Sequence, residues 1–134
     1  MRKLAAFAVL VLAHRLSAQA ARLTDPIGAW RGTSLCLVRP SACNDETVVY
    51  RIARATTSDS LSLDARKIVN GAEVEMGVLA CRLDAPNAQL TCSIPKGVWH
   101  FTVRRDSLVG ELRLPDGTKY RDVRTARSKS AHDS

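Results

Sequence analysis

The sequence predicts an all-β domain, an eight-stranded antiparallel barrel of up-and-down topology. Turn-forming residues recur every 8–14 positions, which is typical of sandwiches and barrels. Between the turns, apolar and polar residues alternate with the period of two expected for strands with one buried face. After residue 20, no run of ten residues shows a clean helical period. Closing the sheet into a barrel leaves no exposed sheet edges, which would otherwise promote aggregation.

The first twenty of the 134 residues have the pattern of a secretory signal peptide. Arg2 and Lys3 precede an apolar run over 4–13, and 17–20 offers a small-residue cleavage site. The run is shorter than the roughly 20 residues that a spanning helix needs. The alternative is an uncleaved amphipathic anchor. We expect a free mature chain beginning near Ala21, in the periplasm or secreted, with no membrane span.

Cleavage would lower the formal net charge from +7 to +4, and that excess lies near the end of the chain. The basic residues there are Lys119, Arg121, Arg124, Arg127 and Lys129. They would suit phosphate groups of nucleic acid or anionic lipid. The alternative is a solvated last strand and tail. Because the chain has few aromatic residues and no nucleic-acid motif, we expect no nucleic-acid partner.

The four cysteines lie in the mature part, and an even number in a small exported chain indicates two disulfides. Three pairings are allowed, and we favour Cys36–Cys43 and Cys81–Cys92. The first would close a loop after the first strand, and the second would cross a hairpin. A zinc site is the alternative, but no CxxC pair occurs, and we expect no metal and no cofactor.

The first four expected strands follow the lead-in that ends at Pro26, and they cover 28–37, 47–54, 61–69 and 73–81. In the first, Gly28 and Gly32 would allow close backbone approach around Trp30, the floor of the barrel. The second alternates regularly, and the third does so from Leu61 to Arg66, with 64–69 the one segment whose period is ambiguous. Asn70-Gly71 between the third and fourth predicts a type I′ turn. In the fourth, Val74, Met76 and Val78 would share a face, and Gly77 would mark a bulge or bend.

The other four expected strands cover 89–94, 98–103, 108–114 and 119–125. Pro95-Lys96-Gly97 and Pro115-Asp116-Gly117-Thr118 are turns in which proline presets φ and glycine accepts positive φ. Trp99, Phe101 and Val103 alternate along the sixth strand. The domain would therefore span 21–125, followed by a disordered polar tail over 126–134.

The Gly28-Ala29-Trp30 start, together with an arginine in the last strand, resembles the lipocalin (calycin) pattern. The resemblance implies that this arginine lies across Trp30 and closes the base of the barrel. Arg121, Arg124 and Arg127 are the candidates, and we assign the closing role to Gly28, Trp30 and Arg124. The chain is short for a lipocalin and lacks the C-terminal helix, which implies a shallower or filled barrel.

Two smaller families also resemble the chain. Exported bacterial metalloprotease inhibitors are eight-stranded barrels of this size whose N-terminal segment inhibits, and the matching stretch is 21–25. Avidin-like barrels begin with a similar glycine–tryptophan strand, but their biotin sites are richer in aromatic residues. These resemblances leave two functions: a monomeric binding protein for a small apolar ligand, or a protein-interaction module such as a protease inhibitor.

An eight-stranded barrel is either filled by side chains or holds one small ligand. We predict that Tyr50, Met76, Trp99 and Phe101 line an apolar pocket, with the Tyr50 hydroxyl as its polar group. The alternative is that these four residues fill the core.

No catalytic residue is predicted, and we expect the chain not to be an enzyme. His100 is a candidate general base beside Asp45 or Glu46, but its position between Trp99 and Phe101 places it outside the barrel. Asn44-Asp45-Glu46 offers three oxygen side chains, which is fewer than Ca²⁺ usually takes, and a loop cap is favoured.

Overall fold

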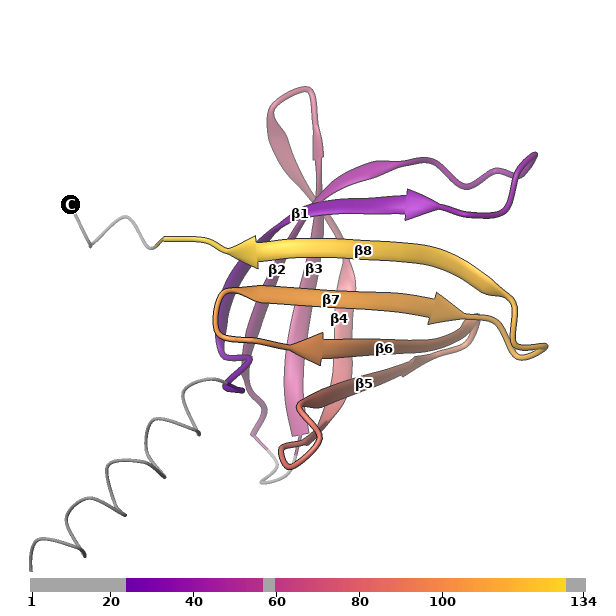
Figure 1. The fold of residues 1–134 in the computed structure, drawn as a ribbon. Helices are drawn as coiled ribbons and strands as arrows, with labels where there is room; N and C mark the ends of the chain where they lie inside the picture. Colours follow the sequence, from indigo (N-terminus) through magenta and orange to yellow (C-terminus); the bar gives the residue numbers. More distant parts are fainter. Residues whose placement is uncertain (1–23, 57–59, 130–134) are drawn as a thin grey trace, which may run out of the picture.

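The structure is a computed structural model that describes residues 24–56 and 60–129, and these form one closed antiparallel barrel (Figure 1). Each of its eight strands pairs with the next, and β8 returns to pair with β1. The predicted fold class is therefore confirmed. The strands are β1 (Gly28–Cys36), β2 (Glu46–Arg54), β3 (Ser60–Val69), β4 (Ala72–Asp84), β5 (Gln89–Ile94), β6 (Gly97–Val103), β7 (Ser107–Arg113) and β8 (Lys119–Arg127).

Two strands extend by two or more residues past their expected ends. β4 has 13 residues and continues to Asp84, past the predicted end at residue 81. β8 continues to Arg127, so Ala126 and Arg127 belong to the sheet and not to a tail that begins at residue 126. The reason is pairing with β1, where Trp30 lies opposite Arg127. A strand can continue through polar residues when a neighbouring strand satisfies its backbone groups.

The predicted signal peptide, 1–20, lies outside the described residues. Within the part of the chain that the structure describes, no helix is long and apolar enough to cross a membrane.

The core lies inside the barrel, on the strand faces that alternation predicts. Trp30 on β1, Leu63 on β3, Leu90 on β5 and Val103 on β6 are fully shielded from solvent. Their neighbours along each strand are more exposed because successive side chains point to opposite faces of a sheet. Burial of this inner face supplies the main driving force for folding.

The prediction for β4 was wrong at one position because of a bulge. The register between β3 and β4 shifts next to Ala65, which faces Gly77, and Met76 is the extra residue. Gly77 has a φ of 146°, as expected for a bulge that favours glycine. The shift moves Leu79 inward, and Val78 is 60% exposed instead of sharing the inner face with Val74 and Met76.

Both predicted disulfides are present, Cys36–Cys43 and Cys81–Cys92, and the described residues include no free cysteine. The first closes the loop between β1 and β2. The second joins directly opposed residues of β4 and β5. Such bonds persist in oxidising compartments, with which the structure is therefore compatible.

Candidate ligand-binding cavity

A cavity of about 200 Å³ lies inside the barrel between β4 and β6. All four residues predicted to bind ligand, Tyr50, Met76, Trp99 and Phe101, line this cavity. The other lining residues are Leu63, Ala65, Gly77, Leu79 and Ile94. The lining is mainly apolar, and its polar side-chain groups are the phenol of Tyr50 and the indole N–H of Trp99. The volume exceeds the roughly 150 Å³ of an engineered apolar cavity that binds benzene.

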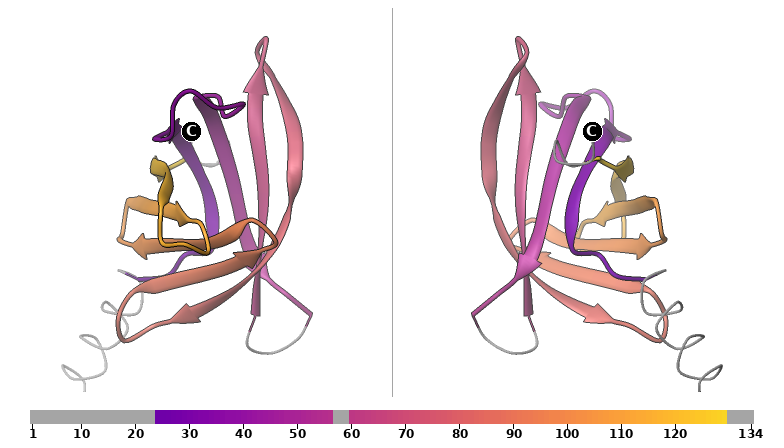
Figure 2. Two further views of the ribbon diagram at one scale, coloured as in Figure 1. Left: turned by 90° about the vertical axis from the view of Figure 1, so that its right-hand side faces the viewer. Right: turned by 90° about the vertical axis from the view of Figure 1, so that its left-hand side faces the viewer.

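The cavity exists because β4 and β5 separate. β4 pairs with β5 only from Cys81 to Asp84, whereas residues 72–80 of β4, apart from the bulge residue Met76, pair with β3 alone. Figure 2 shows the β3–β4 hairpin standing up beyond β5 and β6, which cross the lower part of the barrel. The cavity therefore lies where the barrel wall opens, and Met76, which is 42% exposed, marks its mouth.

Three aromatic rings form one side of the cavity. Trp99 stacks on Phe101 with ring centroids 5.6 Å apart, and Tyr50 meets Phe101 edge-on at 5.9 Å. Tyr50 and Phe101 are almost fully buried and belong to the core, while Trp99 is half-buried at the mouth. The two interpretations of these residues are thus compatible: they pack together and still leave a cavity.

The base of the barrel is closed beneath Trp30, as expected, and the arginine that closes it is Arg127. Its guanidinium carbon lies 4.1 Å from the centroid of the Trp30 ring. Its nitrogens donate to the carbonyl oxygens of Asp25, Ile27 and Arg105 at 2.8–2.9 Å. The indole nitrogen of Trp30 donates to the carbonyl of Pro26 at 2.9 Å.

The assignment of the closing role to Arg124 was therefore wrong. Its side chain is 74% exposed and pairs with Asp122 on the outer surface. The physical reason is the period of two, since Arg124 lies between Val123 and Thr125, which are both buried inside. Arg127 shares the inner face with those two residues.

The two glycines of β1 serve different purposes. A Cβ on Gly32 would lie 2.0 Å from the carbonyl oxygen of Arg124, so β1 and β8 can approach only because the side chain is missing. Gly28 has a φ of 130°, and a Cβ there would lie 3.0 Å from Nη1 of Arg127. Gly28 thus leaves room for the closing guanidinium.

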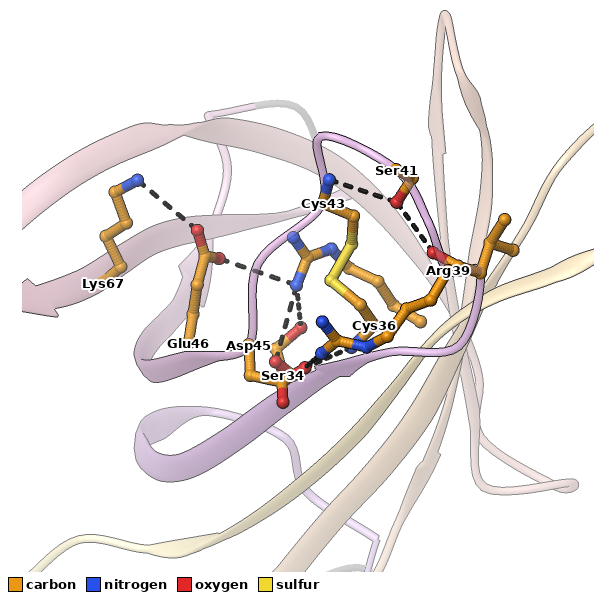
Figure 3. Close-up of a disulfide and its surroundings, with 10 residues drawn as sticks. Ser34, Cys36, Arg39, Ser41, Cys43, Asp45, Glu46 and Lys67 are labelled. Atoms are coloured by element: carbon orange, nitrogen blue, oxygen red, sulfur yellow. Dashed lines mark hydrogen bonds and ion pairs between the residues drawn. A yellow bond between two sulfur atoms is a disulfide. The ribbon is translucent and has the colours of Figure 1, made fainter.

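A cluster of polar side chains, which the sequence analysis missed, lies at the end of β1 away from Trp30, and Figure 3 shows Ser34, Glu46 and Lys67 of this cluster. We call Ser34, Glu46, Lys67 and Arg121 the inner polar cluster. The Glu46 carboxylate accepts a hydrogen bond from Lys67 Nζ at 3.4 Å and lies 3.7 Å from Arg121 Nη1. Arg121 also donates to the hydroxyl of Ser34 at 3.1 Å. Their alternation with Val48, Ala65 and Val123 could have indicated these inward positions.

Tyr50 connects the inner polar cluster to the cavity. Burial raises the pKa of Tyr50 well above its usual value, and the charge of Glu46 acts in the same direction. The positive charge of Arg121 and a hydrogen bond with Ser34 lower the pKa, but burial dominates. The phenol is therefore neutral at physiological pH, and its hydroxyl can donate one hydrogen bond.

The polar stretch Asn44-Asp45-Glu46 is not assembled into a cation site. Asp45 accepts hydrogen bonds from the Cys36 amide at 2.8 Å and from Arg39 at 2.7 Å, which makes it the expected cap of the disulfide loop. Glu46 points inward to Lys67 and Arg121. Over residues 24–56 and 60–129, no three His, Cys, Asp or Glu side chains are grouped to hold a metal ion.

His100 is exposed on the outer face of β6, opposite Glu111 of β7. The carboxylate of Glu111 pairs with Arg113 and Lys119. His100 borders a shallow outer depression of about 420 Å³ that Ser93 and Arg113 also line. Among the groups that the structure describes there, no carboxylate is bonded to the imidazole.

Of the predicted inhibitory segment 21–25, only Thr24 and Asp25 are described, and the Asp25 carbonyl is held at the base by Arg127. Comparisons of the chain with protein-family models, curated proteins and solved structures find no match.

Proposed function

We propose that this protein is an exported, lipocalin-like binding protein that holds a small apolar ligand in the barrel cavity and does not catalyse a reaction. The single observation that carries the proposal is the apolar cavity of about 200 Å³, lined by Tyr50, Met76, Trp99 and Phe101. Apolar clefts with a few polar groups are the usual form of small-ligand sites.

Two further features support this function. Trp30 and Arg127 seal the base in the way that the lipocalin pattern implies, so the cavity is closed at one end. The two disulfides suit a protein that works in an oxidising compartment, in agreement with the signal-like first twenty residues. An inhibitor that acts through residues 21–25 remains the alternative prediction.

The cavity volume limits the size of the ligand. If benzene fits about 150 Å³, then 200 Å³ holds a fused bicyclic ring or a chain of about eight carbons. At about 0.5 kcal/mol per heavy atom, an eleven-atom ligand would bind with a Kd of about 100 μM.

The test uses 1-aminonaphthalene, whose fluorescence rises in apolar surroundings. We expect saturable binding to the full mature chain and a loss of at least about tenfold in affinity in Ala65→Phe, which fills the cavity. Ala65→Leu should give a smaller loss. Ala53→Phe places the same ring on the outer face of β2 and is the matched control.

Thermal unfolding monitored by circular dichroism would show that each variant is folded. If the folded wild-type protein does not bind the probe, or if Ala65→Phe binds it as tightly as Ala53→Phe, the cavity is not a ligand site.

A further inference from the structure

The inner polar cluster lies one step along β3 from the cavity. Leu63 and Ala65 line the cavity, and Lys67 is the next residue of the inner face. Two residues of a strand span about 6.6 Å, which is a few bond lengths of a small organic molecule. On β2, Tyr50 pairs with Ala65, and it lies close enough to Arg121 and Glu46 for their charges to shift its pKa. A ligand lying along β3 would therefore place one end at the cluster.

The cluster holds more positive than negative charge. Glu46 is shared between Lys67 and Arg121, and neither contact is closer than 3.4 Å. The side chains of Glu46 and Arg121 are only 17% and 14% exposed. An unbalanced charge in a partly desolvated site is unfavourable, and a second anion would compensate it.

Other carboxylates near this end do not supply that second anion. Asp45 is bound to Arg39, and Asp64 is bound to Arg66 on the outer face of β3. Glu73 forms a two-pronged contact with Arg51, also outside the barrel. Within the described residues, Glu46 is thus the acidic group paired with Lys67 and Arg121.

We propose that the cavity takes an amphipathic monoanion, with a short apolar body against Leu63, Ala65 and Phe101 and a carboxylate head at Lys67 and Arg121. This inference rests on the proposed function and adds the chemical class of the ligand. Lys67 is the better placed of the two cations to receive the head group, because its side chain is 36% exposed and its contact with Glu46 is long. The Tyr50 hydroxyl can donate a hydrogen bond to the same carboxylate.

The experiment compares three ligands of equal chain length, octanoate, 1-octanol and octylamine, by their displacement of 1-aminonaphthalene at pH 7. We expect octanoate to bind at least about tenfold more tightly than 1-octanol, because hydrogen bonds to charged groups are roughly twice as strong as neutral ones. Octylamine should bind least tightly, since its charge has the same sign as the cluster's excess.

Three variants locate the head group. Lys67→Met should weaken octanoate binding about tenfold and leave 1-octanol within twofold. Lys119→Met is the matched control, because Lys119 is also paired with carboxylates and has a similar exposure of 39%, but lies on the outer surface. Glu46→Gln should tighten octanoate binding several-fold by removing the competing anion.

The outcomes separate this inference from the proposed function. Probe binding that is lost in Ala65→Phe, together with equal affinities for octanoate and 1-octanol, would overturn the anionic class and leave the cavity as a binding site. Probe binding without displacement by octanoate would also overturn it, as would equal octanoate affinities in Lys67→Met and Lys119→Met. Absence of probe binding to the folded wild-type protein would overturn both.

Discussion

The Arg127 guanidinium closes the base of the barrel, and its removal gives a sharp test of that role. Arg127→Met removes three hydrogen bonds to the backbone carbonyls of Asp25, Ile27 and Arg105, together with the contact with the Trp30 ring. Because these carbonyls are partly accessible to water, each bond contributes about 0.5–1 kcal/mol. The cation–π contact adds about 0.5–1 kcal/mol. We expect the free energy of unfolding to fall by about 3 kcal/mol.

The assay is urea denaturation followed by tryptophan fluorescence, with both disulfides intact. Arg124→Met is the matched control, since it removes the same group from the outer face of the same strand, where it makes one contact at 3.4 Å. We expect the control to change stability by less than about 0.5 kcal/mol. Equal effects of the two substitutions would show that the base is not held by Arg127.

Two other predictions concern packing and acid stability. Gly110→Ala should lower the free energy of unfolding by about 2 kcal/mol in urea denaturation, because the new Cβ would lie 2.3 Å from the Phe101 ring; an unchanged midpoint would show that Phe101 moves freely. A hydrogen bond from Arg113, and secondarily one from Lys119, lowers the pKa of Glu111 below its usual value of 4.5. The ionised Glu111 carboxylate therefore stabilises the fold fully above pH 4.5, and this stabilisation is lost as the pH falls through the lower pKa of the folded state. Glu111→Gln should therefore lose less stability than the wild type between pH 6 and pH 3, and parallel losses would contradict this linkage.

The strand faces could be predicted because alternation is a local property of the sequence. Phe101 lies between the more polar His100 and Thr102, and alternation along β2 and β6 places Tyr50 and Trp99 around the same cavity. Met76 was assigned to the same cavity, and it lies at the mouth as the extra residue of the bulge in β4.

Two errors concern which residues of a strand face the interior. One arose because a bulge interrupts the alternation of β4, and the other because several nearby arginines of β8 were candidates for one role. The bulge at Met76 reverses the alternation after it, so Val78 faces outward. The position of the bulge depends on pairing with β3, which cannot be read from the sequence of β4 alone. The choice among Arg121, Arg124 and Arg127 could have been narrowed by Val123, the large apolar residue of β8. Odd-numbered arginines share its face, which excludes Arg124.

The inner polar cluster was missed for a different reason. Lys67 and Glu46 are at or near strand ends, where a charged residue is usually solvated, so alternation with Val48 and Ala65 is a weak signal of an inward position there. Their meeting depends on β1, β2, β3 and β8 closing into one barrel, and so on long-range pairing.

Under the proposed function, a ligand that enters the cavity past Met76 and Trp99 also leaves past them, because Trp30 and Arg127 close the base of the barrel. Entry and exit of the ligand then share one transition state. A substitution that widens this entrance would raise both rates by the same factor and leave the equilibrium occupancy of the cavity unchanged. Changes at the entrance would therefore alter the residence time of the ligand at constant affinity, whereas changes in the interior would alter affinity and residence time together.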